Sequence, residues 1–151
     1  MRTLHLAVTT GAAVLLAVLV LAVAAGLWHR RQDGRLRPPR PAVSDPTSPA
    51  GALTPADLPV PLGQRATLVQ FSSAFCAPCR TARVVLAEVA RTTPGVVHVE
   101  IDAEQRLDLV RRVGVLRTPT VLVLDARGVE VRRASGAPRK VDVLAALADV
   151  G

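Results

Sequence analysis

The two cysteines of this chain, Cys76 and Cys79, stand between two different sequence patterns. The apolar run 67–72 before them favours a β-strand, and apolar residues recur at helical spacing over 81–91 after them. We therefore expect the pair where a buried strand turns into a helix. There, unpaired backbone N–H groups and the helix dipole favour a thiolate at Cys76. Cys79 lies one turn further on, close enough for a small disulfide, and the first helical turn tolerates Pro78.

Redox chemistry, metal binding and inert thiols are the alternatives for this pair. A structural disulfide across so short a loop would remove little entropy from the unfolded chain. A structural zinc site needs four ligands, and His5, His29 and His98 are distant in sequence. A metal shared between two copies of the chain stays open as an alternative. The strand–turn–helix context favours redox chemistry, for which no metal or cofactor is required.

Three segments resemble the thioredoxin family. Residues 70–79, Gln-Phe-Ser-Ser-Ala-Phe-Cys-Ala-Pro-Cys, are similar to its active-site stretch. Residues 115–120, which include Thr118-Pro119, resemble the segment in which thioredoxins carry a cis-proline opposite the cysteines. Residues 97–102 are similar to its central strand ending in Asp. The resemblance covers residues 66–150 and implies an α/β, thioredoxin-like fold with a mixed sheet flanked by helices.

The resemblance also implies the function of the site residues. Cys76 would attack a disulfide of a target protein, and Cys79 would then release the product. Thr118, beside a cis Pro119, would pair its backbone with an extended substrate segment. The residues that complete the substrate-binding surface would be Phe75, Ala77 and Pro78. These roles predict a protein disulfide reductase with protein disulfide substrates and a thiol electron donor; the alternative is a non-catalytic binding, redox-sensing or metal-carrier module.

Three positions depart from the family pattern. Phe75 replaces the tryptophan before the first cysteine, Gln70 replaces a buried acid, and His98 corresponds to a buried lysine. Because an amide cannot accept the Cys79 proton as a carboxylate can, another base or water must do so. His98 is the candidate proton relay, since imidazole titrates near neutral pH; the alternative is a histidine packed in the core.

The N-terminal part of the chain predicts a membrane anchor. After a flank of residues 1–5, the stretch 6–28 is dominated by Ala, Val and Leu and carries no charge, so it is long enough for a transmembrane helix. A cleaved signal peptide is the alternative, with Ala22-Val23-Ala24 as its cleavage site. Arginines are more numerous after the stretch than before it, which predicts a single-pass membrane protein with a cytoplasmic catalytic domain. The alternative is an extracytoplasmic domain, where disulfides persist.

Residues 29–65 read as a linker rich in Arg and Pro, which precedes a catalytic domain over 66–151. Its prolines forbid long helices and favour extended polyproline segments. The linker is too short and too rich in proline to supply the strand and helix that thioredoxins carry before the active-site strand. We therefore expect these two elements to be reduced or missing, with at most one turn after Thr54.

The formal charge of +7 comes almost entirely from arginine, and only 2% of the residues are aromatic. Without an aromatic stacking platform or a binding motif, nucleic acid is not an expected partner. After the first helix, we expect a strand over 96–102, a helix over 103–112, a strand over 120–124, a turn at 125–128, a strand over 129–134 and a helix over 141–150. The expected core positions of the two helices are Leu107, Leu109, Val110, Val113, Val143, Leu144 and Leu147.

Overall fold

The structure is a computed structural model that describes residues 2–39 and 53–150, and it forms two compact units. The first unit, Met1–Gln32, contains the helix α1 (Arg2–Gln32). The predicted helix over 6–28 is thus confirmed as a helix, because Ala and Leu are strong helix formers. The second unit, Asp33–Gly151, contains the cysteines and is described below by itself.

The prediction that α1 spans a membrane is not supported. Among the described residues, no helix is both long and apolar enough to cross a membrane.

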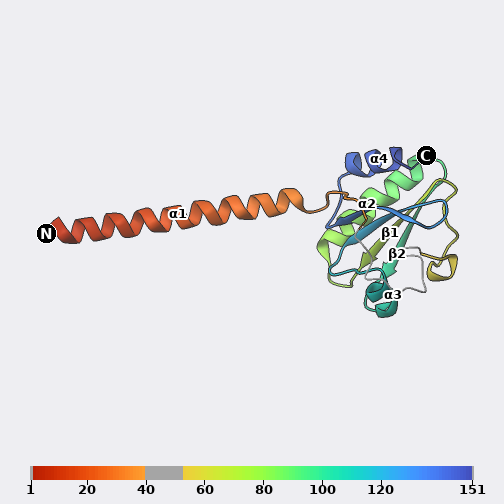
Figure 1. The fold of residues 1–151 in the computed structure, drawn as a ribbon, viewed down its shortest axis with the longest axis horizontal. Coiled ribbons are helices and arrows are strands. Elements are labelled where there is room, and N and C mark those ends of the chain that lie inside the picture. Colours follow the sequence, from red (N-terminus) through yellow and green to blue (C-terminus); the bar gives the residue numbers. More distant parts are fainter. Residues whose placement is uncertain (1, 40–52, 151) are drawn as a thin grey trace. The chain divides into compact units, whose positions relative to one another are not determined.

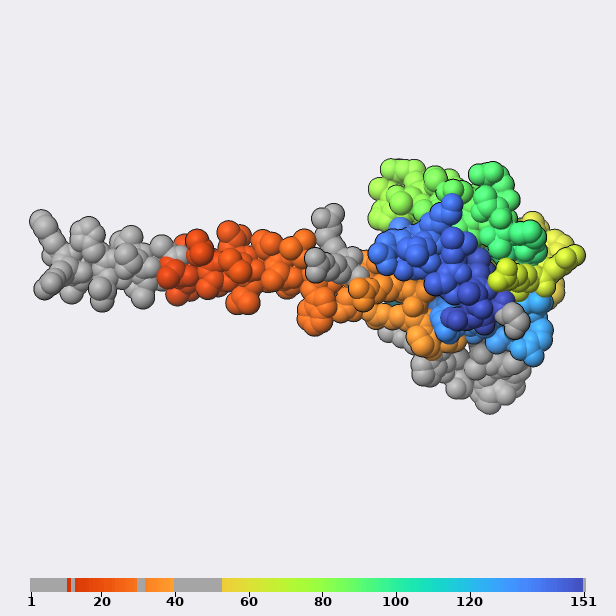
Figure 2. Space-filling model, turned by 90° about the horizontal axis from the view of Figure 1, so that it is seen from above, coloured from red at the N-terminus to blue at the C-terminus, as the bar shows by residue number. Residues whose placement is uncertain are grey.

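A mixed four-stranded sheet forms the centre of the second unit, as predicted. Its strands are β1 (Ala66–Ser72), β2 (Val96–Asp102), β3 (Thr120–Asp125) and β4 (Glu130–Ser135), in the order β2-β1-β3-β4. β1 and β2 are parallel, and β3 is antiparallel to both β1 and β4. The helices α2 (Ala77–Thr92) and α4 (Lys140–Ala148) cover one face, and α3 (Leu107–Arg112) covers the other (Figure 1). In Figure 2, α4 in blue borders α2 in green, and an ion pair between Lys140 and Glu88 joins the two helices.

Each face of the sheet has its own apolar core. Leu68 points to the face that α2 and α4 cover, and Val69 and Phe71 point to the face of α3, as strand alternation requires. On the first face, the apolar column Ala66 and Leu68 continues into the polar, buried pair Gln70 and Ser72. The sheet therefore changes from apolar to polar towards the end of β1 that precedes the cysteines.

The helix expected over 103–112 is shorter than predicted. The carboxylate of Asp102 accepts hydrogen bonds from the backbone N–H of Glu104 and the side chain of Gln105, which hold 103–106 in a turn. α3 therefore begins only at Leu107, as expected where an Asx side chain competes with helical bonding. Leu107 and, in α4, Leu144 are exposed rather than part of the core.

Parts of the expected linker pack against the domain. Arg37 forms an isolated bridge with Arg133 of β4, and Leu53 and Leu58 are buried in the core on the α3 face. The turn expected after Thr54 is the short 3₁₀ helix η1 (Pro55–Asp57). In the described stretches 33–39 and 53–65, no further helix or strand precedes β1. The rest of the expected linker, 40–52, lies outside the described residues.

Candidate active site

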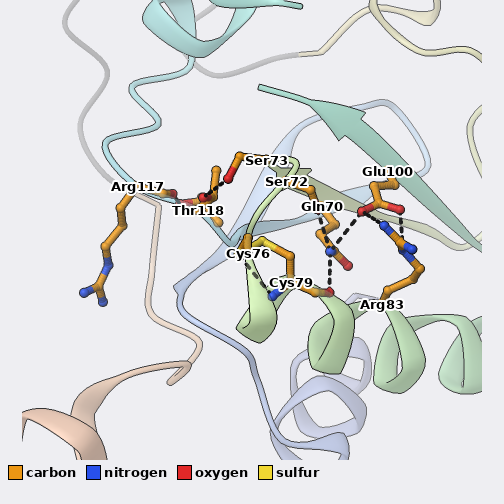
Figure 3. Close-up of a disulfide and its surroundings, with 10 residues drawn as sticks. Gln70, Ser72, Ser73, Cys76, Cys79, Arg83, Glu100, Arg117 and Thr118 are labelled. Carbon is orange, nitrogen blue, oxygen red and sulfur yellow. Dashed lines mark hydrogen bonds and ion pairs between the residues drawn. A yellow bond between two sulfur atoms is a disulfide. The ribbon is translucent and has the colours of Figure 1, made fainter. Parts of the chain in front are cut away.

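Cys76 and Cys79 lie where β1 turns into α2 and are joined by a disulfide (Figure 3). Cys76 is the N-cap residue of α2, and its sulfur accepts a hydrogen bond of 3.2 Å from the backbone N–H of Cys79. Ala77 and Pro78 form the first helical positions, where the missing N–H of proline costs nothing. Cys76 is 9% exposed and Cys79 is 2% exposed. Cys76 is therefore the sulfur that a partner can reach.

Exposed apolar side chains flank the cysteines in the chain and also occur in the segment that leads to Pro119. Phe75 is fully exposed, and Ala77 and Pro78 are exposed beside it. Leu116, in the segment that leads to Pro119, is 78% exposed and was not predicted as a site residue. Single exposed apolar residues are ordinary on protein surfaces, but these four belong to the segment of the cysteines and the segment of Pro119. They form an apolar rim, defined here as Phe75, Ala77, Pro78 and Leu116.

The peptide bond between Thr118 and Pro119 is cis, as the resemblance implied. The Thr118 side chain and Ser73 share a hydrogen bond of 2.9 Å between their hydroxyls, which ties this loop to the turn of the cysteines (Figure 3). The carbonyl of Pro119 accepts a hydrogen bond of 2.7 Å from the backbone N–H of Gly136. Two bonded contacts thus hold the loop of Thr118 in place beside the disulfide.

Gln70 occupies a fully buried position behind Cys79. Its amide nitrogen donates hydrogen bonds to the hydroxyl of Ser72 at 2.7 Å and to the carbonyl of Cys79 at 2.9 Å. A longer contact of 3.5 Å joins the same nitrogen to Glu100 Oε1. The amide oxygen of Gln70 is also buried and has no hydrogen-bond partner in the part of the chain that the structure describes.

Glu100 on β2 forms an ion pair with Arg83 on α2. Arg83 Nη2 lies 2.7 Å from Oε1 of Glu100, and Arg83 Nε lies 2.6 Å from Oε2. Burial raises the pKa of Glu100, but hydrogen bonds from Arg83 and Ser72 and the charge of Arg83 outweigh it. The pKa of Glu100 therefore lies below its ordinary value, and the group is a carboxylate at neutral pH.

His98 does not join this network. In the parallel pairing of β1 and β2, His98 lies opposite Leu68, and Glu100 lies opposite Gln70. The Nε2 atom of His98 is buried without a hydrogen-bond partner among the described residues. Burial, which outweighs the opposing charge of Glu100, lowers the pKa of His98 below its usual value. The proton relay expected at His98 thus has no hydrogen-bonded connection to the cysteines.

Sequence analysis missed Glu100, Arg83, Ser72, Ser73 and Leu116. Glu100 gave a partial signal, because alternation along 96–102 places it on the same face of β2 as His98, but only the register in the structure places it beside Gln70. Arg83, Ser73 and Leu116 gave no local signal, since each acquires its role only when α2 and the loop of Pro119 are positioned. Within residues 2–39 and 53–150, no group of three or more His, Cys, Asp or Glu side chains could hold a metal ion.

The fold and the site together define the class of this molecule: a mixed sheet flanked by helices, with a Cys-x-x-Cys disulfide at the amino end of a helix and a cis-proline loop beside it. Residues 58–149, more than half of the chain, match the family model described as Thioredoxin. The chain therefore belongs to the thioredoxin family.

Named relatives agree with this assignment. Thioredoxin H4-1 of Oryza sativa subsp. japonica is 34% identical over 84 residues, which are 54% of this chain and 63% of that protein. Thioredoxin H-type of Oryza sativa subsp. indica is 30% identical over 79 residues, 52% of this chain and 63% of that protein. The chain thus spans less than two thirds of the length of these curated relatives.

Solved structures give the same fold. The thioredoxin NaTrxh from Nicotiana alata is 31% identical with a TM-score of 0.50, covering 58% of this chain and 74% of that one. Fasciola hepatica thioredoxin is 25% identical with a TM-score of 0.52, covering 59% of this chain and 84% of that one.

Proposed function

We propose that the chain is a thiol–disulfide oxidoreductase that reduces protein disulfides through Cys76 and Cys79. The observation that carries the proposal is the disulfide at the N-terminus of α2, in which Cys76 is more exposed, at 9%, than Cys79, at 2%. The helix N-terminus stabilises a thiolate at Cys76 in the reduced form. The thioredoxin family membership supports the same reaction class.

The reaction begins with the reduced pair. The Cys76 thiolate attacks one sulfur of a substrate disulfide, so that the substrate S–S bond breaks and the second substrate sulfur leaves as a thiolate that takes up a proton. Cys79 then loses its proton and attacks the Cys76 sulfur of the mixed disulfide. The second substrate thiol is released, and the Cys76–Cys79 disulfide seen in the structure forms. Two electrons pass to the substrate, and an external thiol donor must return them.

The surroundings of the disulfide favour an extended protein segment as the substrate. The apolar rim can cover apolar residues on either side of a substrate cysteine. Thr118 lies beside the disulfide, and we propose that its backbone pairs with the segment as an added strand would. The resulting contacts would place a substrate sulfur over Cys76, the more accessible of the two.

The test is reduction of a model protein disulfide by the chain in the presence of an external dithiol. Cys76→Ser should abolish turnover above the dithiol background, because the attacking sulfur is lost. Cys79→Ser should accumulate mixed disulfides with the substrate, visible on a non-reducing gel. Full turnover by the Cys76→Ser variant would show that the nucleophile is assigned to the wrong residue.

We also propose, from the sequence alone, that residues 6–28 tether the domain to a membrane and leave it in the cytoplasm. The uncharged run and the arginines that follow it support this proposal, although no described helix is long and apolar enough to span a membrane. Intact cells should be labelled, after reduction, with a membrane-impermeant thiol reagent. Cys76 should react only after lysis; reaction before lysis would place the domain outside, and recovery in the soluble fraction would contradict the tether.

A further inference from the structure

We propose that Glu100 and Arg83 form a positioning pair that sets the proton affinity of the Cys79 thiol through Gln70. The proposal rests on the proposed exchange reaction and names two residues for its second step. In that step Cys79 must lose a proton before it can attack the mixed disulfide. The ease of that loss depends on the charges near its sulfur.

The connection between the pair and Cys79 runs through the side chain of Gln70 to the backbone carbonyl of Cys79. Gln70 and Glu100 face each other on neighbouring parallel strands. The same amide nitrogen of Gln70 contacts Glu100 Oε1 and donates to the carbonyl of Cys79 (Figure 3). The hydroxyl of Ser72 accepts a hydrogen bond of 2.7 Å from the same nitrogen. The carboxylate therefore lies one side chain away from the resolving cysteine, on β2 rather than at position 70.

The two members of the pair act on Cys79 with opposite signs. A carboxylate near a thiol disfavours the thiolate, and a guanidinium favours it. The side chain of Glu100 is 26% exposed and that of Arg83 is 55% exposed, so that solvent screens the positive charge more than the negative one. The pair as a whole therefore favours the protonated form of Cys79.

The other charged or titratable groups that the structure describes near the site make no hydrogen bond to Gln70 or Ser72, although His98 interacts with Glu100 through charge. On β2, Asp102 accepts from Glu104 and Gln105, and His98 is buried without a bonded partner. In the loop before Pro119, Arg117 pairs with Asp33. On α2, Arg80 is exposed, and where α2 meets α4, Glu88 pairs with Lys140. Among the described residues, the charged side chains bonded to the Gln70 and Ser72 network are therefore Glu100 and, through it, Arg83.

The experiment measures the dissociation of the Cys79 thiol in the Cys76→Ser background, from the ultraviolet absorbance of the thiolate as a function of pH. Glu100→Gln keeps the size of the side chain and removes its charge, so the dissociation constant should rise about threefold. Arg83→Met leaves the carboxylate without its partner, so the constant should fall by about the same factor. The matched controls are Asp142→Asn and Arg139→Met, which divide a similar bidentate pair at the start of α4, and they should leave the constant unchanged.

Opposite shifts are the signature of an electrostatic role, because a merely structural pair would move the constant in one direction whichever partner is removed. Shifts of the same sign, or no shift, in variants with unchanged circular dichroism would overturn the proposal. If Glu100→Gln fails to fold, Arg83→Met and Arg83→Lys decide the question, since the lysine variant should retain the original constant. Turnover of the unmodified chain on a protein disulfide is measured separately. Turnover with unmoved constants refutes only the pair, and moved constants without turnover refute only the proposed function.

Discussion

A substitution of Phe75 should affect substrate binding without affecting the stability of the fold. Its side chain is fully exposed next to Cys76, so it contributes almost nothing to the folded core. Phe75→Ser should therefore change the free energy of unfolding by no more than about 0.5 kcal/mol. The same change should raise the KM for a protein disulfide and leave reduction of a small disulfide unchanged, because only a protein substrate covers the ring. Equal turnover of protein substrates by both chains would contradict a substrate-binding role.

The cysteines could be predicted at the level of single residues, whereas their partners could not. A Cys-x-x-Cys pair is recognisable within four residues, and Pro119 belongs to the recognisable pair Thr118-Pro119. His98 was expected to act as a proton relay beside Gln70. Which residue of β2 lies opposite Gln70 depends on how β1 and β2 align. Because the structure pairs Gln70 with Glu100, the polar partner of Gln70 is found two residues further along β2. Local sequence patterns do not contain that alignment.

At the scale of elements, α2 depends on its buried face. Leu86 is fully buried between α2 and the sheet, and Val84 on the same helix is 67% exposed. Leu86→Ala should lower the free energy of unfolding by about 2–5 kcal/mol, because it removes buried methyl groups and leaves a cavity. Val84→Ala is the matched control and should cost no more than about 0.5 kcal/mol. Urea unfolding measures both, and equal losses would mean that the two faces are assigned wrongly.

A second element-scale prediction concerns η1 and α3, which Asp57 joins through its contact with Arg112. Burial raises the pKa of Asp57, but hydrogen bonds from Thr54 and Arg112 and the charge of Arg112 outweigh it, leaving the pKa below the ordinary 3.8. Such a depressed pKa means that stability is present above the unfolded-state value and is lost as pH falls through the folded-state value.

The free energy of unfolding should therefore decline as pH drops below 3.8, the ordinary value for this carboxyl group. Asp57→Asn should remove part of that decline, since the amide does not titrate. Asp108→Asn, at the exposed start of α3, is the matched control and should retain the full pH dependence. Chemical unfolding at a series of pH values gives the comparison; an unchanged slope in the Asp57→Asn variant would count against this contact.

The elements themselves were predicted well where hydrophobic periodicity decides them and poorly where a polar side chain does. All four strands and the last helix lie within a few residues of their expected places. α3 lost its first turn because Asp102 bonds to the chain that follows it. The spacing of apolar residues over 103–112 contains no information about this hydrogen bond from Glu104 to Asp102.

At the scale of the whole molecule, the second unit should fold without the first. The unit from Asp33 onwards contains both apolar cores, the sheet and the disulfide. A fragment of residues 33–151 should therefore unfold cooperatively at nearly the same temperature as the full chain. A fragment of residues 53–151 should unfold at a lower temperature, because it lacks the pairing of Arg37 with Arg133 and the ion pair of Asp33 with Arg117. Identical thermal transitions for the two fragments would show that residues 33–52 add nothing to stability.

The contacts that residues 33–39 make with the sheet could not be read from the composition of the linker. Arginine and proline in 29–65 describe how the isolated segment behaves in water. This composition does not show that part of the segment can pair with the outer strand of the sheet. Arg37 pairs with Arg133 through backbone groups, which any residue except proline can supply, so that the side chains give no signal of the contact.

That contact has a consequence for how copies of this protein behave in a crowded solution. The outermost strand of a sheet carries unpaired N–H and C=O groups, which can template pairing with another chain. Here the backbone N–H of Arg37 donates to Arg133 at 2.7 Å, Arg133 donates back at 2.8 Å, and Gly34 donates to Ser135 at 2.7 Å. The main chain of residues 34–37 thus pairs with the outer edge of β4. A proteolytic cut after Arg37 that releases this stretch should expose the edge of β4 and favour self-association.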